Sequence, residues 1–143
     1  MAVVISVNIS EKRGTRKHEV PEIRLITGYG IDGDAHAGDW HRQVSLLADE
    51  SIDLMRKDHV SGLVSGAFAE NMITRGIDLK NLPLHTRLRI GPVLLEITQI
   101  GKECHNDCEI RRAAGRCVMP TDGIFAKVIE GGLIRPGDSI AIE

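Results

Sequence analysis

The stretch TRLRIGPVLLEITQI, residues 86–100, has the clearest structural pattern in the chain. Thr86 to Ile90 and Val93 to Ile100 are two runs rich in branched apolar residues, and the dipeptide Gly91-Pro92 between them is typical of a turn. We therefore predict a β-hairpin whose second arm is strongly apolar.

Further extended segments are predicted on both sides of this hairpin. Val3 to Asn8 and Gln43 to Leu47 have β-like patterns, and Glu22 to Ile31 forms an extended stretch that ends in a glycine-rich segment. Near the end of the chain, Ser139 to Ile142 alternates apolar and small residues behind a Pro136-Gly137-Asp138 turn. The chain thus contains several short strands at close spacing.

Helices are predicted to be few and short. Asp49 can cap a helix that runs through Lys57, with Ile52, Leu54 and Met55 on its inner side. A second helix is predicted over Gly123 to Glu130, because its apolar residues recur at helical spacing and Gly131-Gly132 follows. Ala67 to Ile73 fits a strand or a helical turn, and periodicity leaves both open.

Length and composition agree with one mainly β domain over residues 1–143. The chain has only 3% aromatic residues, so Ile, Leu and Val must fill its core, and branched residues favour pleated surfaces. The short strands do not follow the regular strand and helix alternation of a doubly wound sheet. We expect a closed or half-closed β-barrel with two or three short helices.

Charge and hydropathy exclude several classes of partner. The net charge of -2 and the lack of a basic run interleaved with aromatics argue against nucleic acid. No 18 consecutive residues are apolar, and Met1 leads directly into a strand-like pattern without a charged leader. These features predict a cytoplasmic protein that does not enter membranes.

The three cysteines lie in one short segment. Cys104 and Cys108 belong to the run KECHNDC, residues 102–108, and Cys117 follows after three arginines, Arg111, Arg112 and Arg116. An odd number of cysteines in a reducing compartment argues against a disulfide framework. Neighbouring cations lower the pKa of a thiol from about 8.5, and the thiolate is both a nucleophile and a soft-metal ligand.

The residues leave two alternatives open in this segment. Cys117 stands beside Val118 and Met119 and fits a small buried apolar residue as well as a functional one. Cys108, with charges on both sides, favours a functional role. Zinc is a rival, because three cysteines and a histidine supply tetrahedral ligands, but the second closely spaced pair typical of zinc sites is missing.

Two other segments contain candidate binding residues. Gly33 to Arg42 combines small residues with His41 and Arg42, which could donate to an anion, although a solvated loop with two satisfied histidines fits the same spacing. Glu70 and Asn71 pair a carboxylate with an amide that can orient a polar ligand, but such pairs are common on surfaces.

Taken together and in order, these segments resemble a MOSC domain, the family named for the C-terminal domain of molybdenum cofactor sulfurase. The resemblance spans nearly the whole chain, and Ala69 stands where we expect glycine. It is carried by residues 10–15 (SEKRGT), 30–38 (GIDGDAHAG), 40–47 (WHRQVSLL), 66–71 (GAFAEN), 101–108 (GKECHNDC), 115–120 (GRCVMP), 123–126 (GIFA) and 135–138 (RPGD).

This resemblance implies a β-barrel that binds the molybdenum cofactor, a molybdopterin, with a cysteine as sulfur acceptor or molybdenum ligand. The family's cysteine maps best to Cys108, with Cys104 and Cys117 as competitors. The segments expected to line the pocket contain His36, His41, Arg42, Glu70 and Asn71, and Arg111 and Arg112, between Cys108 and Cys117, are further expected cofactor-binding residues. Relatives pass sulfur toward metal cofactors or, with redox partners, reduce N-hydroxylated compounds.

The resulting hypothesis is a stand-alone MOSC domain with Cys108 as persulfide carrier or molybdenum thiolate ligand. The sequence contains neither the pyridoxal-phosphate domain of larger relatives nor an iron–sulfur cysteine set, so catalysis would need a sulfur donor, a molybdoenzyme or a redox partner. The alternatives are a non-catalytic module that delivers the cofactor and a small zinc protein.

Overall fold

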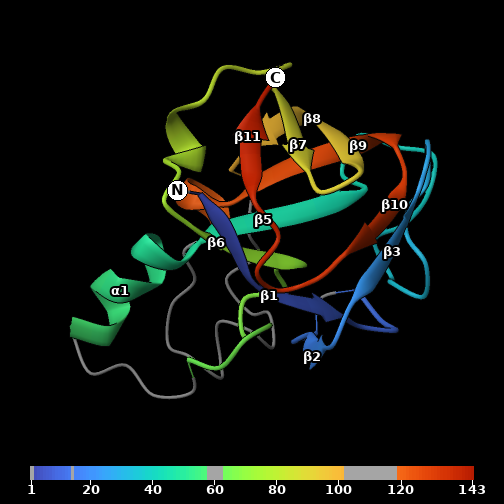
Figure 1. Ribbon diagram of the computed structural model, residues 1–143. Coiled ribbons are helices and arrows are strands. Elements are labelled where there is room, and N and C mark those ends of the chain that lie inside the picture. The colour runs from blue at the N-terminus through green and yellow to red at the C-terminus, as the bar shows by residue number, and fades with distance from the viewer. Residues whose placement is uncertain (1, 14, 58–62, 102–118) are drawn as a thin grey trace.

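The computed structural model describes residues 2–13, 15–57, 63–101 and 119–143, and it is mainly β (Figure 1). Within these residues the larger sheet has eight strands in the order β11-β7-β8-β9-β5-β6-β1-β2, and a smaller sheet has three in the order β10-β3-β4. The strands of the larger sheet are β11 (Ile140–Ile142), β7 (Arg87–Ile90), β8 (Val93–Ile100), β9 (Ile124–Glu130), β5 (Val44–Ala48), β6 (Met72–Arg75), β1 (Val3–Ile9) and β2 (His18–Val20). Those of the smaller sheet are β10 (Gly132–Ile134), β3 (Ile23–Ile26) and β4 (Gly30–Ile31).

The predicted hairpin is confirmed. Strands β7 and β8 pair antiparallel, with Ile90 opposite Val93 across the turn, and the apolar arm β8 continues into an antiparallel pairing with β9. The predicted strands near Val3, Gln43 and Ser139 correspond to β1, β5 and β11. The extended stretch from Glu22 to Ile31 is divided by a turn into β3 and β4, which pair with each other.

The helix predicted over Gly123 to Glu130 is wrong. These residues form β9, which lies between β8 and β5 in the sheet, and the short helix α3 (Met119–Asp122) ends just before it. Ile124, Phe125 and Ala126 are consecutive buried residues, as in a central strand that is covered on both faces. A short apolar run of this kind cannot be told from a helix by periodicity.

The helix predicted from Asp49 to Lys57 is confirmed as α1 (Asp49–Lys57). Ile52 and Met55 face the core, but Leu54, which we also expected on the inner side, is 60% exposed. Residues three apart share a helix face, whereas Leu54 lies two positions from Ile52 and points away from it. The segment left open, Ala67 to Ile73, is a turn followed by the start of β6, which runs parallel to β5.

The core consists of two clusters. The larger one is made of aliphatic side chains from strands of both sheets, such as Leu46, Leu95 and Ile31. The smaller one lies under α1 and contains Phe68 and Phe125. The core is thus built mainly from Ile, Leu and Val, as the low aromatic content of the sequence predicted.

Barrel closure stays a prediction, because the strand pairings of the described residues form two separate sheets. The start of β1 nevertheless lies beside the start of β11 (Figure 1), where an isolated bridge joins Val3 to Ser139. The N–H of Val4 also donates to the carbonyl of Asp138 (2.9 Å). None of the described helices is long and apolar enough to cross a membrane.

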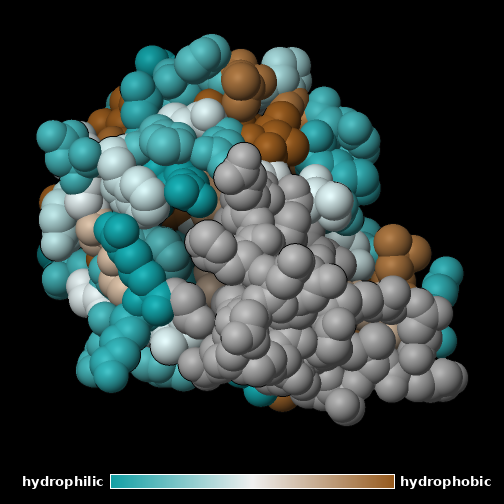
Figure 2. All heavy atoms as spheres, turned by 180° about the vertical axis from the view of Figure 1, so that it is seen from behind, coloured by the Kyte–Doolittle hydropathy of each residue, from teal (hydrophilic) through white to brown (hydrophobic). Residues whose placement is uncertain are grey.

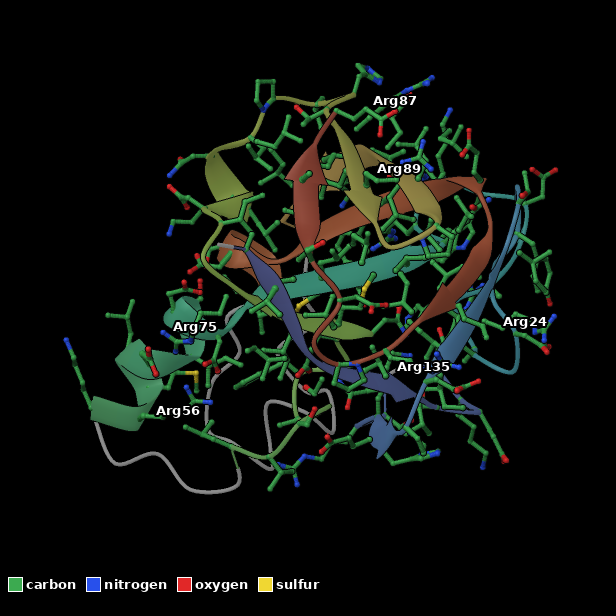
Figure 3. All side chains as sticks on the ribbon, in the orientation of Figure 1. Arg24, Arg56, Arg75, Arg87, Arg89 and Arg135 are labelled. Atoms are coloured by element: carbon green, nitrogen blue, oxygen red, sulfur yellow. The ribbon has the colours of Figure 1, made fainter. Side chains whose placement is uncertain are left out.

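The described surface is largely polar. Several arginines form surface ion pairs (Figure 3): beside α1, Arg56 and Arg75 both contact Asp49, and on β7 Arg89 contacts Glu130 (2.8 Å). Seen from behind, hydrophobic residues show as separate patches between hydrophilic ones (Figure 2).

Candidate functional site

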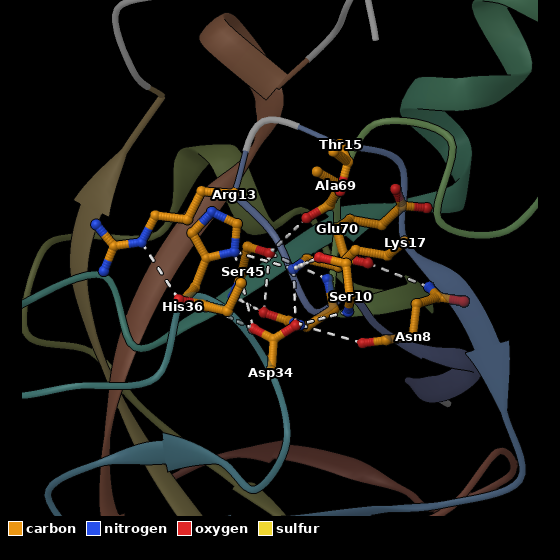
Figure 4. A network of polar contacts seen from close by, with 12 residues as sticks. Asn8, Ser10, Arg13, Thr15, Lys17, Asp34, His36, Ser45, Ala69 and Glu70 are labelled. Carbon is orange, nitrogen blue, oxygen red and sulfur yellow. Dashed lines mark hydrogen bonds and ion pairs between the residues drawn. The ribbon is translucent and has the colours of Figure 1, made fainter. Parts of the chain in front are cut away.

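A buried ion pair joins two loops that are separated in the sequence. Lys17 Nζ lies 2.7 Å from Asp34 Oδ1, and both side chains are 0% exposed (Figure 4). Lys17 also donates to Ser10 Oγ (3.0 Å), and the N–H of Ser10 donates to Asp34 Oδ1 (3.1 Å). The loop after β1 is thereby fixed to the loop after β4.

His36 belongs to the same network. Its Nδ1 lies 2.9 Å from Lys17 Nζ, and its backbone N–H donates to Asp34 Oδ2 (3.1 Å). The indole N–H of Trp40 donates to the carbonyl of His36 (2.7 Å). The predicted site residue His36 is therefore held at a fixed position, with its side chain 18% exposed.

Asp34 is the anionic centre of the network. Burial by itself would raise its pKa, but the charge of Lys17 and the hydrogen bonds from Lys17 and from the N–H of Ser10 outweigh this effect and hold the pKa well below its usual value. Asp34 is therefore ionised at neutral pH and balances the ammonium group of Lys17.

Glu70 stabilises the turn on which the backbone of Lys17 rests. Its two carboxyl oxygens accept the N–H groups of Gly66 (3.0 Å) and Phe68 (2.9 Å), and the side chain is completely buried. Gly66 accepts the N–H of Lys17 on its carbonyl (2.9 Å). Burial raises the pKa of Glu70 to about 7, against the opposing effects of these N–H groups and of Lys17.

Asn71 is equally buried and connects three strands. Its Oδ1 accepts the N–H of Ser45 (2.9 Å) on β5, and its Nδ2 donates to the carbonyl of Asn8 (3.1 Å) on β1. Asn71 itself directly precedes β6. The contacts described for Glu70 and Asn71 thus position the chain around the site, and a direct role for either in cofactor binding stays a prediction.

Ala69 has a positive φ of 63°. This left-handed conformation is readily adopted by glycine and costs roughly 1–2 kcal/mol for other residues. The sequence expectation of glycine before Glu70 therefore has a physical reason, although this chain has alanine there.

Arg42 packs over two aromatic rings. Its guanidinium carbon lies 5.0 Å from the ring centroid of Trp40 and 5.5 Å from that of Phe125. Its Nε is buried and has no hydrogen-bond partner in the part of the chain that the structure describes. A buried donor without an acceptor costs roughly 1–3 kcal/mol, so this atom is suited to an acceptor supplied by a ligand.

Arg13 and His41 lie close to this aromatic pair. Arg13 is stacked on Trp40 with its guanidinium carbon 4.5 Å from the ring centroid, and its Nε donates to the carbonyl of Ala35 (3.2 Å). His41 is exposed, with Nε2 2.8 Å from Gln99 Oε1 on β8. The two loops thus bring two guanidinium groups and two imidazoles to one side of the molecule.

A hollow of about 310 Å³ adjoins the buried ion pair. Ser10 lines it and also contacts Lys17 and Asp34. The other lining residues are mainly cationic or polar: Glu11, Lys12, Thr15, Arg16 and His18. Its volume lies at the low end for ligand pockets, which favours a small anionic group rather than an entire cofactor.

The predicted thiol site lies outside the described residues. This applies to Cys104, Cys108, Cys117, Arg111 and Arg112, all within residues 102–118. Elsewhere in the described ranges, no three His, Cys, Asp or Glu side chains are grouped so that they could hold a metal ion.

The sequence predicted His36, His41 and Arg42 as site residues, but not the contacts that hold them in position. Lys17 was not singled out, because nothing in its local sequence shows that it is buried opposite Asp34. The ordered combination of the two loop motifs, 10–15 and 30–38, was the one signal that they could meet.

Comparison with known proteins defines the family. The family model for the MOSC domain matches residues 32–141, which is more than half of the chain, so the chain belongs to the MOSC domain family. The matched range includes Asp34, Arg42 and the cysteine segment. No curated protein matches the chain.

Solved structures share the fold at low sequence identity. The YuaD protein from Bacillus subtilis has a TM-score of 0.78 and 18% identity, with 98% of this chain and 94% of that chain covered. YiiM from Geobacillus stearothermophilus has a TM-score of 0.76 and 15% identity, with 100% of this chain and 75% of that chain covered. YiiM from Escherichia coli has a TM-score of 0.72 and 20% identity, with 100% of this chain and 70% of that chain covered.

Proposed function

We propose that this MOSC domain protein binds the molybdenum cofactor through the two loops that carry Arg13, Lys17, His36 and Arg42. The observation that carries the proposal is the Nε of Arg42, a buried donor that has no acceptor among the described residues and lies beside two aromatic rings. Family membership indicates which ligand to consider, and the cationic character of the loops suits its phosphate.

The residues present fit such a ligand. A phosphate group can be held by the cations that line the 310 Å³ hollow, Lys12 and Arg16, because guanidinium and ammonium groups are the usual phosphate donors in proteins. Arg42 offers its fixed guanidinium to further acceptor atoms. The Lys17–Asp34 pair keeps both loops in place without adding net charge.

Within this proposal Cys108 is the persulfide carrier or the molybdenum thiolate ligand. Soft thiolate sulfur suits both roles, and the cofactor, when bound, supplies the redox-active metal. Arg111 and Arg112 are proposed to favour the ionised thiol. A sulfur donor, a molybdoenzyme or a redox partner protein completes the reaction.

The proposal also includes the overall architecture, the extent of the domain and the cellular location. It takes the two sheets as the wall of a half-closed barrel, which the bridge between Val3 and Ser139 supports. It treats residues 1–143 as one functional unit. It places the protein in the cytoplasm, where thiols remain reduced.

The binding proposal is tested with Arg42→Met in a host that makes the cofactor. We expect the variant to retain at least tenfold less pterin and molybdenum per chain than the wild type after the same purification. Methionine cannot donate the hydrogen bond that Arg42 Nε is proposed to give to an acceptor atom of the cofactor. The matched control is Arg24→Met, an exposed arginine on β3, which should retain cofactor like the wild type. Equal retention by the two variants would overturn the role of Arg42.

The cysteine assignment has its own test. Cys108→Ala should abolish sulfur transfer or partner-dependent reduction, whereas Cys104→Ala and Cys117→Ala should keep most of it. A Cys108→Ala protein with full activity beside a competent partner contradicts the assignment. Retained cofactor without any activity in the wild type would indicate the non-catalytic delivery module instead.

A further inference from the structure

The contacts of Lys17 restrict the protonation state of His36. Among its contacts with described residues, Lys17 Nζ lies near Asp34 Oδ1 (2.7 Å), Ser10 Oγ (3.0 Å) and His36 Nδ1 (2.9 Å), and an ammonium group can only donate hydrogen bonds. Ser10 Oγ uses its own hydrogen to donate to the carbonyl of Lys12 (3.0 Å), so it must accept from Lys17. In each of these three contacts Lys17 is thus the donor.

An ammonium group cannot accept a hydrogen bond, so a short contact with it requires an unprotonated Nδ1. A neutral imidazole carries one proton, which must then be on Nε2. Protonating both nitrogens would place an N–H against the ammonium of Lys17 and add a second cation beside it. The single carboxylate of Asp34 already balances Lys17, with Oδ2 at 3.7 Å from His36 Nδ1.

We propose that Lys17 is a positioning residue that fixes His36 as a neutral hydrogen-bond donor through Nε2. The ring then serves as a donor to an acceptor atom of the ligand, such as an anionic or oxo oxygen, and not as a proton acceptor. The identity of that ligand rests on the proposed function, whereas the state of the ring does not.

The surrounding structure keeps Lys17 in place for this task. Its N–H donates to the carbonyl of Gly66 (2.9 Å), within the turn that Glu70 stabilises. On the other side, Trp40 donates to the carbonyl of His36 (2.7 Å). Lys17 and His36, which Figure 4 shows side by side, are therefore both anchored through their backbones.

The ring state is measured by long-range ¹H–¹⁵N correlation on protein labelled at histidine. The chain has six histidines, and His36→Gln assigns the signal of interest. We expect Nδ1 of His36 at the unprotonated position and Nε2 at the protonated position at about pH 7. A protonated Nδ1 in the wild type would overturn the inference, whatever the variants do.

Lys17→Met tests the cause. Without the ammonium group, Nδ1 can take the proton and donate to Asp34 Oδ2, so we expect the Nδ1 signal to move toward the protonated position. The control Lys12→Met, on the same loop, should leave both signals unchanged. If Lys17→Met folds and keeps the wild-type tautomer, Lys17 does not set it. If that variant fails to fold, the wild-type spectrum decides alone, because a protonated Nδ1 there contradicts the contact with the ammonium group of Lys17.

A pair of substitutions tests the donor role toward the ligand. Glutamine places its amide nitrogen near the position of Nε2, and asparagine near that of Nδ1, so His36→Gln should retain several-fold more cofactor than His36→Asn. Equal retention by both would contradict the donor role. A wild type that binds no cofactor would refute the proposed function, while the measured tautomer would still decide the role of Lys17.

Discussion

Gly66 is the residue at which the site's geometry depends most on the absence of a side chain. It has a φ of +86°, and a Cβ there would lie 2.1 Å from the carbonyl oxygen of Lys17. Gly33 has the same φ of +86° but open space around the added atom. The two glycines therefore separate the cost of the backbone conformation from the cost of the close contact.

We expect Gly66→Ala to lower the free energy of unfolding by about 2 kcal/mol or more beyond Gly33→Ala, since the clash is with backbone and adds to a dihedral cost of about 1–3 kcal/mol. Urea unfolding of both variants measures the difference. Equal losses would show that the contact with Lys17 relaxes easily.

Glu70 gives the stability of the protein a pH dependence of defined sign. Its pKa is about 7 in the folded chain, above the ordinary value of 4.5. Between these values the folded state holds a proton that the unfolded state releases, so the free energy of unfolding should fall as pH rises from about 4.5 to 7, by roughly 3 kcal/mol from this group. Glu70→Gln should remove this decline in denaturation curves recorded across the range, and the surface variant Glu22→Gln should keep it.

Asp34 gives the stability of the protein a pH dependence of the opposite sign. Its pKa lies below the ordinary 3.8, so the stability it contributes is complete above that value and is lost as pH falls further. The two carboxyls thus act in separate pH windows. A wild-type stability that rises between pH 4.5 and 7 by as much as we expect it to fall would contradict the assignment for Glu70.

Individual residues of the site could be predicted from the sequence, but their contacts could not. His36 and Arg42 stood out because imidazole and guanidinium groups follow small residues in one loop. The burial of Lys17, 17 positions away from Asp34, depends on how the loops after β1 and β4 meet. Local patterns contain no information on such a long-range pair.

At the level of elements, Asn71 connects β5 and β1 next to the start of β6. Asn71→Ala would leave the buried N–H of Ser45 and the carbonyl of Asn8 without these partners, and each buried unpaired group costs about 1–3 kcal/mol. We expect a loss of about 3 kcal/mol in the free energy of unfolding, measured by urea denaturation.

Asn81→Ala provides the matched control for this prediction. Asn81 is at the end of the short helix η1 (Leu79–Asn81), and its amide contacts Asp78 at the surface (2.6 Å). Surface substitutions usually change stability by no more than about 0.5 kcal/mol. A loss at Asn71 as small as that at Asn81 would mean that the three strands do not depend on this amide.

Elements with a strong local signal were predicted well. The hairpin of β7 and β8 follows from two apolar runs around Gly91-Pro92, and α1 follows from Asp49 at its start and the apolar residues Ile52 and Met55 on its inner side. β9 was mistaken for a helix because its apolar residues are buried on both sides of the sheet and show no alternation. Its two neighbours β8 and β5 determine its conformation, and both are distant in sequence.

At the scale of the whole molecule, the sheet arrangement brings the loop after β1 to the loop between β4 and β5. This arrangement places Ser10, Lys17, His36 and Arg42 in one region although they come from two separate loops. The mainly β class and the family could be predicted from sequence, because ordered motifs cover most of the chain. The sheet order could not, because short strands of similar composition fit several pairings.

The most direct test of the account is the cofactor content of the wild-type protein. Protein purified gently from a host that makes molybdenum cofactor should contain pterin and molybdenum in a fixed ratio to the chain, by metal analysis and pterin fluorescence, with an intact mass raised accordingly. Protein that contains stoichiometric zinc and no pterin would contradict the central claim.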